Sequence, residues 1–170
     1  MVEAQRPFSG EQFLQSLIDG VQDLQRINVE PNFTIAPSKV RHLNHHLNMK
    51  YSQEHPLLLA YSSLTGMSAP GIRLPFVCAS FVDFDRVNFE EGYFYRGDFH
   101  NSTFREASLQ KADFPGAIFT VADLTQAHFE EAQCMSTDFR RALFAETYLR
   151  EARLDEADLR SARELNRAYD

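Results

Sequence analysis

The sequence lacks the features that place a chain in a membrane or hold a small secreted domain together. No apolar run is long enough to span a bilayer. The start, MVEAQRPFSG, has no basic region followed by an apolar stretch, so we expect no secretory signal. Two cysteines, Cys78 and Cys134, are too few for a disulfide framework. We therefore expect a reducing, cytoplasmic compartment.

Basic residues are scarcer than acidic ones, 17 against 24, which gives a net charge of −7. The imbalance is confined to one part of the chain, because residues 1–75 hold six residues of each sign and sum to zero. Residues 76–170 therefore carry the whole negative charge. Phosphate contacts need Lys and Arg, so we expect no direct binding to nucleic acid.

A period of five residues runs without insertion from Val82 to Ser161. Every fifth residue from Phe84 is Phe or Leu, except Cys134, and the residue two places before it is small or β-branched. Neither a helix nor a strand has this period, so each five-residue unit must return the chain to the same relation with an axis. The predicted inward positions are Phe84, Phe89, Phe94, Phe99, Phe104, Leu109, Phe114, Phe119, Leu124, Phe129, Cys134, Phe139, Phe144, Leu149, Leu154 and Leu159.

A turn signal falls in register with this period. Pro115-Gly116 follows the inward residue Phe114, and Pro followed by Gly suits the two central positions of a type II turn.

The units resemble those of the pentapeptide-repeat family, whose unit reads A-(D/N)-(L/F)-x-x. Matching units include Ala112-Asp113-Phe114, Ala122-Asp123-Leu124 and Ala157-Asp158-Leu159. The resemblance covers about half of the chain. It implies an all-β solenoid, a right-handed quadrilateral β-helix with four units per turn, in which residues n and n+20 stack. Sixteen units then make about four coils.

Three segments follow from this pattern: a non-repeat N-terminal segment at 1–75, the β-helix at 76–161, and a short C-terminal capping helix or tail at 162–170. In the first segment, Ser9 is a candidate N-cap with Gln12 three residues on, before the apolar helical face Phe13, Leu14, Leu17, Ile18, Val21 and Leu24. A second helix starts near Ser38 and presents Val40, Leu43 and Leu47. Pro31, Pro37, Pro56, Pro70 and Pro75 indicate loops. The segment is either an N-terminal helical cap or a partner-binding module.

Acidic side chains gather on two adjoining sides of the expected solenoid. Solvation and protection against aggregation explain such a surface. A docking surface for a protein partner with a basic surface is the functional alternative. Its candidate residues are Asp83, Asp85, Glu90, Glu91, Glu130 and Glu131.

A histidine cluster, His42, His45 and His46, falls on the second expected helix. His42 and His46 are four residues apart, a spacing that can place two imidazoles on one metal ion. No Cys, Asp or Glu lies close by in sequence to complete the shell, which favours a polar helix face and no bound metal.

The two thiols and the hydroxyls suggest no chemistry. Cys134 is at an inward position and is expected to be a packed thiol, while Cys78 lies before the repeat and could face outward. No Ser/His/Asp order, paired-carboxylate segment or glycine-rich phosphate loop stands out, so we expect no enzymatic activity, no catalytic residue and no cofactor.

Three functional hypotheses remain open. The first is a non-enzymatic protein–protein interaction or scaffold module, because solenoids present extended rigid faces. The second is a DNA-mimic modulator of DNA gyrase, implied by the resemblance and by the acidic sides. Four coils, the absence of projecting loops, and Arg140, Arg141 and Arg160 on one side depart from that pattern. The third is metal-binding activity at the histidine cluster. An uncapped C-terminal coil would also favour a two-fold homodimer.

Overall fold

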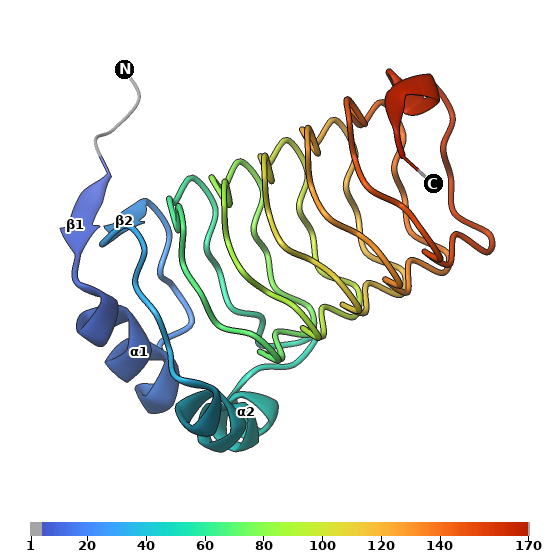
Figure 1. Cartoon of the computed structure of the whole chain (residues 1–170). Helices are drawn as coiled ribbons and strands as arrows, with labels where there is room; N and C mark the ends of the chain where they lie inside the picture. Colours follow the sequence, from blue (N-terminus) through green and yellow to red (C-terminus); the bar gives the residue numbers. More distant parts are fainter. Residues whose placement is uncertain (1–4, 170) are drawn as a thin grey trace.

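The computed structural model describes residues 5–169. The first four residues of the expected N-terminal segment and Asp170 of the expected tail lie outside the described residues. The chain winds into a solenoid, with two helices at its N-terminal end (Figure 1). The elements are β1 (Arg6–Phe8), α1 (Gly10–Asp19), β2 (Ile27–Val29), α2 (Pro37–Lys50) and a terminal 3-10 helix, η1 (Leu165–Arg167).

Each coil of the solenoid takes 20 residues. Parallel bridges join residue n to residue n+20, and one continuous ladder runs through Leu58, Cys78, Asp98, Ile118, Asp138 and Asp158. The four inward residues of a coil are spaced by five, so each coil has four sides. This is the β-helix solenoid predicted from the repeat. Neither helix within residues 5–169 is long and apolar enough to cross a membrane.

The β-helix begins earlier than the sequence predicted. Residues 57–75 already form a coil, since Leu58, Ser63, Ser68 and Arg73 pair with the residues 20 positions later. The boundary predicted at residue 76 is therefore wrong, and the 20-residue ladder extends beyond the predicted four coils. The repeat is hard to recognise here because two central inward positions are occupied by the small residues Ala69 and Ala79. The large inward side chains are instead Met67 and Val77, two residues earlier in each unit.

Short parallel pairings extend the ladder below this coil. Pro7 of β1 pairs with Asn28 of β2, and Asn28 pairs with Ser63. Asp23 and Thr34 make the neighbouring bridges to Leu58 and Ser68. Residues 22–35 therefore form part of a coil, and α2 follows where the rest of that coil would run.

The first helix matches its predicted start but not its predicted length. The Ser9 side chain accepts from the Gln12 amide, and the Gln12 side chain accepts from the Ser9 amide, which confirms the N-cap. The helix ends at Asp19 because Gly20 adopts φ 76°, a left-handed C-cap. Val21 and Leu24 lie beyond it, so their predicted place on the helical face is wrong. Leu24 is nevertheless buried in the core.

The second helix begins at Pro37, one residue before the predicted start, and buries Val40, Leu43 and Leu47. Pro at the first helical turn is favourable because its missing N–H has no partner there in any case.

The corners of the coils are tight turns with a left-handed residue. Gly116 has φ 67°, and the Ala117 amide donates to the Phe114 carbonyl at 3.0 Å, which confirms the turn predicted at Pro115-Gly116. Three prolines assigned to loops precede left-handed residues in the same way, as Pro31-Asn32, Pro70-Gly71 and Pro75-Phe76. Those prolines mark coil corners rather than irregular loops.

The core is a stack of inward side chains. The predicted inward positions from Phe84 to Phe144 are buried, and rings in successive coils stack, as in Phe94–Phe114 with centroids 5.1 Å apart. Buried hydroxyls replace some of the small residues. Thr137, for example, donates to the Phe114 carbonyl of the preceding coil at 2.8 Å. Polar atoms at these positions therefore have partners.

The segment 162–170, expected to be a short capping helix or a tail, contains the 3-10 helix η1 in place of an α-helix. Arg163 pairs with Leu143, and Tyr169 pairs with Tyr148, so the last described residues continue the coil around η1. Leu149, Leu154 and Leu159 are only partly buried, because no further described coil covers them.

Candidate interaction surface

One side of the solenoid combines exposed aromatic residues with arginines. It is the side whose inward residues are Ala79, Phe99, Phe119, Phe139 and Leu159. We call its exposed residues the aromatic–arginine strip and define it by Tyr61, Phe81, Ile118, Arg140, Arg141 and Arg160. Ile118, Arg140 and Arg160 flank an inward position and point outward, because side chains alternate along an extended segment. Tyr61, Phe81 and Arg141 are the left-handed corner residues that follow.

The aromatic half of the strip lies toward the N-terminus. Tyr61 and Phe81 stack with ring centroids 4.9 Å apart, yet they remain 43% and 45% exposed. The Phe81 ring meets His100 edge-on, and the Arg26 guanidinium lies 5.4 Å from the Tyr61 centroid. Ile118, in a later coil, is 39% exposed. Large apolar side chains occupy positions that are polar in most other coils.

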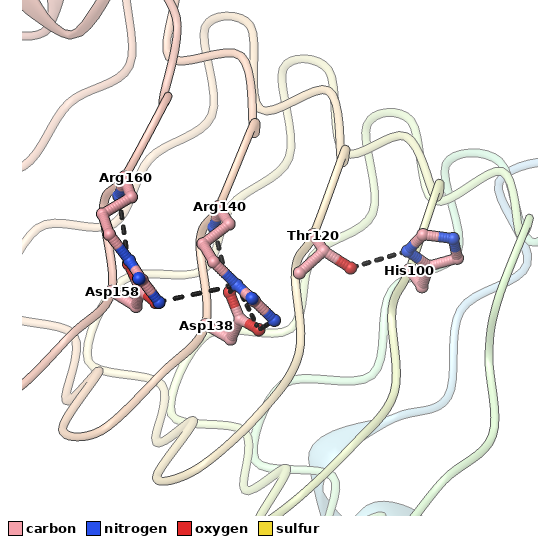
Figure 2. A network of polar contacts seen from close by, with 6 residues as sticks. All are labelled: His100, Thr120, Asp138, Arg140, Asp158 and Arg160. Carbon is pink, nitrogen blue, oxygen red and sulfur yellow. Dashed lines mark hydrogen bonds and ion pairs between the residues drawn. The ribbon is translucent and has the colours of Figure 1, made fainter.

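The arginine half is an ordered ladder (Figure 2). Asp138 accepts from Arg140 at 2.7 Å, Asp158 accepts from Arg160 at 2.6 Å, and Arg140 reaches across to Asp158 at 3.6 Å. Hydrogen bonds from Arg160 lower the pKa of Asp158 to about 2, and those from Arg140 lower the pKa of Asp138. Both carboxylates therefore stay ionised at neutral pH and hold the two guanidinium groups in place.

Arg141 differs from its neighbours. Among residues 5–169 its side chain has no carboxylate within ion-pair distance. It lines a shallow groove of about 480 Å³ together with His100, Thr120, Val121, Arg140, Arg160 and Ser161. The His100 ring bonds to the Thr120 hydroxyl at 2.6 Å, which fixes the near wall (Figure 2). The groove thus offers one guanidinium without an ionic partner beside two that are already oriented.

The predicted acidic residues lie on the two other sides expected for them, and most already form a hydrogen bond or an ion pair within the chain. Asp85 pairs with Arg105 at 2.6 Å, and Asp83 accepts from the Thr65 hydroxyl at 2.8 Å. Glu90 accepts from Ser108 at 2.8 Å.

Glu130 also has a partner within the chain. Its carboxylate lies 3.1 Å from His128. Burial raises the pKa of Glu130, but hydrogen bonds from His128 and from its own backbone amide outweigh it, and the net pKa is lowered. Glu131 is 3.9 Å from Lys111, and only Glu91 lacks a side-chain contact within the described part of the chain. The structure brings Glu90, Glu91, Glu130 and Glu131 onto one side of the solenoid.

The remaining predicted residues lie elsewhere. The histidine cluster is on α2, at the N-terminal end of the solenoid. Cys134 is buried, and Cys78 is half-buried with its thiol 3.9 Å from the Phe76 carbonyl. Both thiols are free.

Tyr61, Phe81 and Ile118 were missed at the level of sequence. The available signal was a large apolar residue at a position that is polar in other units. Ile118 shows it within the recognised repeat. Tyr61 and Phe81 show it only once the register is extended below Val82.

Comparison with known proteins agrees with this architecture. The pentapeptide-repeat profile matches eight copies, over residues 83–120 and 137–167. The crystal structure of the pentapeptide repeat protein Rfr23 from the cyanobacterium Cyanothece 51142 superposes with a TM-score of 0.54 at 15% identity, over 98% of this chain and 85% of that one. None of the curated proteins matches the chain.

Two further structures match the chain at lower similarity. A pentapeptide repeat protein from the Arabidopsis thaliana thylakoid lumen is 20% identical with a TM-score of 0.45, over 64% of this chain and 70% of that one. QnrB1, a plasmid-mediated fluoroquinolone resistance protein, is 14% identical with a TM-score of 0.39, over 66% and 67%. These similarities concern the fold alone. The period of five, the 20-residue ladder and the matching profile together show that this chain belongs to the pentapeptide-repeat family.

Proposed function

We propose that this protein is a non-enzymatic protein–protein interaction module and that the aromatic–arginine strip is its binding surface. The observation that carries the proposal is the exposed Tyr61–Phe81 stack in line with the arginine ladder. Aromatic residues and Arg are the residue types enriched in the cores of protein interfaces. They also supply most of the binding energy where they are rigidly held.

The strip selects a partner with two features. Apolar side chains would pack on Tyr61, Phe81 and Ile118, and a carboxylate would pair with Arg141, whose charge is not offset. Arg140 and Arg160 are already oriented by Asp138 and Asp158, so little side-chain entropy is lost when they bind. The acidic side around Glu91 and Glu131 is a second candidate surface, for a basic partner.

The test is capture of partners from a lysate of the source cells by the full chain and by two matched variants. The strip variant is Tyr61→Asn, Phe81→Asn and Arg141→Asn. All three positions have φ near 60°, which Asn tolerates, so the turns are preserved. The acidic variant is Glu91→Lys and Glu131→Lys, two corner positions in the column where Lys111 already occurs.

A partner retained by the acidic variant and lost by the strip variant supports the proposal. A partner lost by the acidic variant alone moves the function to the acidic side. Turnover of a substrate by the purified chain would overturn the non-enzymatic assignment.

We also propose that β1 and the two helices cap the solenoid. Phe13, Leu14 and Leu17 of α1 are buried in the same core as the first coil. Among residues 5–169, β1 is the outermost paired segment at this end, and it contains Pro7, which cannot donate to another strand. The cap would protect the exposed edge of the first coil from pairing with other chains.

The DNA-mimic hypothesis is the second candidate. One of the three departures from that pattern is weaker than expected, because the β-helix extends beyond four coils. The arginine ladder still occupies the C-terminal half of one side, where a mimic of duplex DNA would carry negative charge. An unchanged supercoiling rate of DNA gyrase, with this protein in large excess, would exclude the hypothesis.

A further inference from the structure

Two histidines on α2 have imidazole rings that lie in contact with each other. His42 and His46 are one helical turn apart, and their Nε2 atoms lie 3.3 Å from each other. The ring centroids are 4.9 Å apart with the planes at 70°. Both residues lie on the outer part of the helix, since its buried face is formed by Val40, Leu43 and Leu47.

This separation matches the edge of a tetrahedral metal site. Two Zn–N bonds of about 2.05 Å at the tetrahedral angle place the nitrogens about 3.3 Å apart, whereas a right angle places them at about 2.9 Å. In the metal-free pair one Nε2 carries the proton that the other accepts. If that ring moves its proton to Nδ1 and the rings turn so that the two Nε2 lone pairs converge, both nitrogens can bind one cation without any net loss of a proton.

We propose that His42 and His46 bind one divalent cation of the zinc type through their Nε2 atoms. His45 is not included, because its ring centroid lies 5.9 Å from that of His46, farther than the 4.9 Å that separates His42 and His46. Residues 5–169 contain no group of three or more metal-binding side chains, so the other coordination positions are filled by water or by another molecule.

The surroundings of the pair bear on its affinity. His42 lines a groove of about 260 Å³ between α1 and α2 with Glu11, Gln15 and Lys39. Glu11 and Gln15 bring oxygen donors to the same groove, whereas Lys39 adds a positive charge that opposes a cation. A site with two protein ligands and exchangeable positions binds more weakly than a closed structural site.

The experiment titrates zinc chloride into the untagged full chain by calorimetry, in a Cys78→Ser background, since the half-buried thiol is another potential zinc ligand. His42→Ala is the test variant. His45→Ala is its matched control, with the same residue type on the same helix. Far-ultraviolet circular dichroism verifies that both variants are folded.

The proposal predicts one equivalent of zinc, a rise in melting temperature when zinc is added, and binding weakened about tenfold or more by His42→Ala. His45→Ala should bind zinc as the parent does. Absence of binding to the parent would overturn the proposal. Equal affinities of the His42→Ala variant and the parent, or equal losses in both variants, would overturn it as well.

Discussion

Nearly every corner of the solenoid needs one residue with a positive φ, and at most corners that residue is not glycine. Val121, a β-branched residue, adopts φ 64° in this position. An L-residue in this region costs roughly 1–2 kcal/mol, and the cost is offset by stacking against the coils above and below. Gly116 and Gly71 are among the few corners that avoid it.

Gly116→Ala isolates this cost. A Cβ at Gly116 would meet only Arg96 Cγ, at 3.5 Å, so no clash arises. We expect the free energy of unfolding to fall by about 1 kcal/mol, measured by urea denaturation, because Ala disfavours φ 67°. Ser136→Ala, in the same column one coil later, should change it by less than about 0.5 kcal/mol. Equal effects of the two substitutions would contradict this account.

The two thiols should differ in reactivity. Burial, and then the charge of Asp98, raises the pKa of Cys78, and burial raises the pKa of Cys134. A raised pKa lowers the thiolate fraction at neutral pH, so alkylation of Cys78 should be slow there and accelerate as pH rises. Cys134 should react only after denaturation. Mass spectrometry after iodoacetamide treatment at several pH values measures both rates, and labelling of Cys134 in the native protein would contradict the assignment.

At the scale of the structural element, the coil of residues 57–75 belongs to the β-helix. Cutting before residue 76 removes the partners of Cys78, Asp83, Asn88 and Tyr93 and uncovers the Phe84 coil. We expect a 76–170 fragment to melt well below a 52–170 fragment, which keeps the coil, when both are followed by circular dichroism. Equal melting temperatures of the two fragments would instead support the boundary predicted at residue 76.

The missed coil shows what the period could and could not predict. From Phe84 onward the central inward residue is Phe or Leu in every unit except that of Cys134, and its position alone gave the register. Before Phe84, the central residues Ala79 and Ala69 are small, and Val77 and Met67, two residues earlier in each unit, supply the volume. A search back from Phe84 for Phe or Leu at the centre therefore stops too early. The packing constraint is on the summed volume of each inward layer rather than on one position. Pro70-Gly71, which repeats the Pro115-Gly116 signal, marks the continuation.

The candidate site was less predictable than the fold. Acidic side chains could be assigned to sides by counting, but the counting could not show that Asp85 is neutralised by Arg105 or that Glu90 is held by Ser108. Conversely, the stacking of Tyr61 on Phe81 follows from the 20-residue step once the coil is known. A site on a solenoid is built from residues of neighbouring coils, 20 positions apart. The sequence identifies these neighbours only after the register of every coil is known.

At the scale of the whole molecule, the two ends of the solenoid differ. The N-terminal end has β1 and α1, while at the C-terminal end Leu154 and Leu159 are only partly buried and Leu165 and Tyr169 are exposed. We predict a two-fold dimer through this end. Light scattering should give a mass that falls with dilution for the wild type, and Leu165→Asp should be monomeric throughout.

Ile118→Asp is the control for this prediction, because it changes an exposed apolar residue away from the end. It should leave the association unchanged. A wild-type chain that is monomeric at all concentrations would show that η1 covers the end sufficiently.

The central claim is that the aromatic–arginine strip is the surface that binds a protein partner. Site-specific photo-crosslinking tests it most directly, with a photoreactive phenylalanine analogue placed at Phe81 on the strip or at Glu91 on the acidic side. Both residues are left-handed corner positions, with φ 59° and 55°, so the two probes are matched in backbone setting. We predict a discrete crosslinked protein from position 81 in a lysate of the source cells, abolished by Arg141→Asn, and none from position 91. A discrete product from position 91 alone would contradict the claim and place binding on the acidic side.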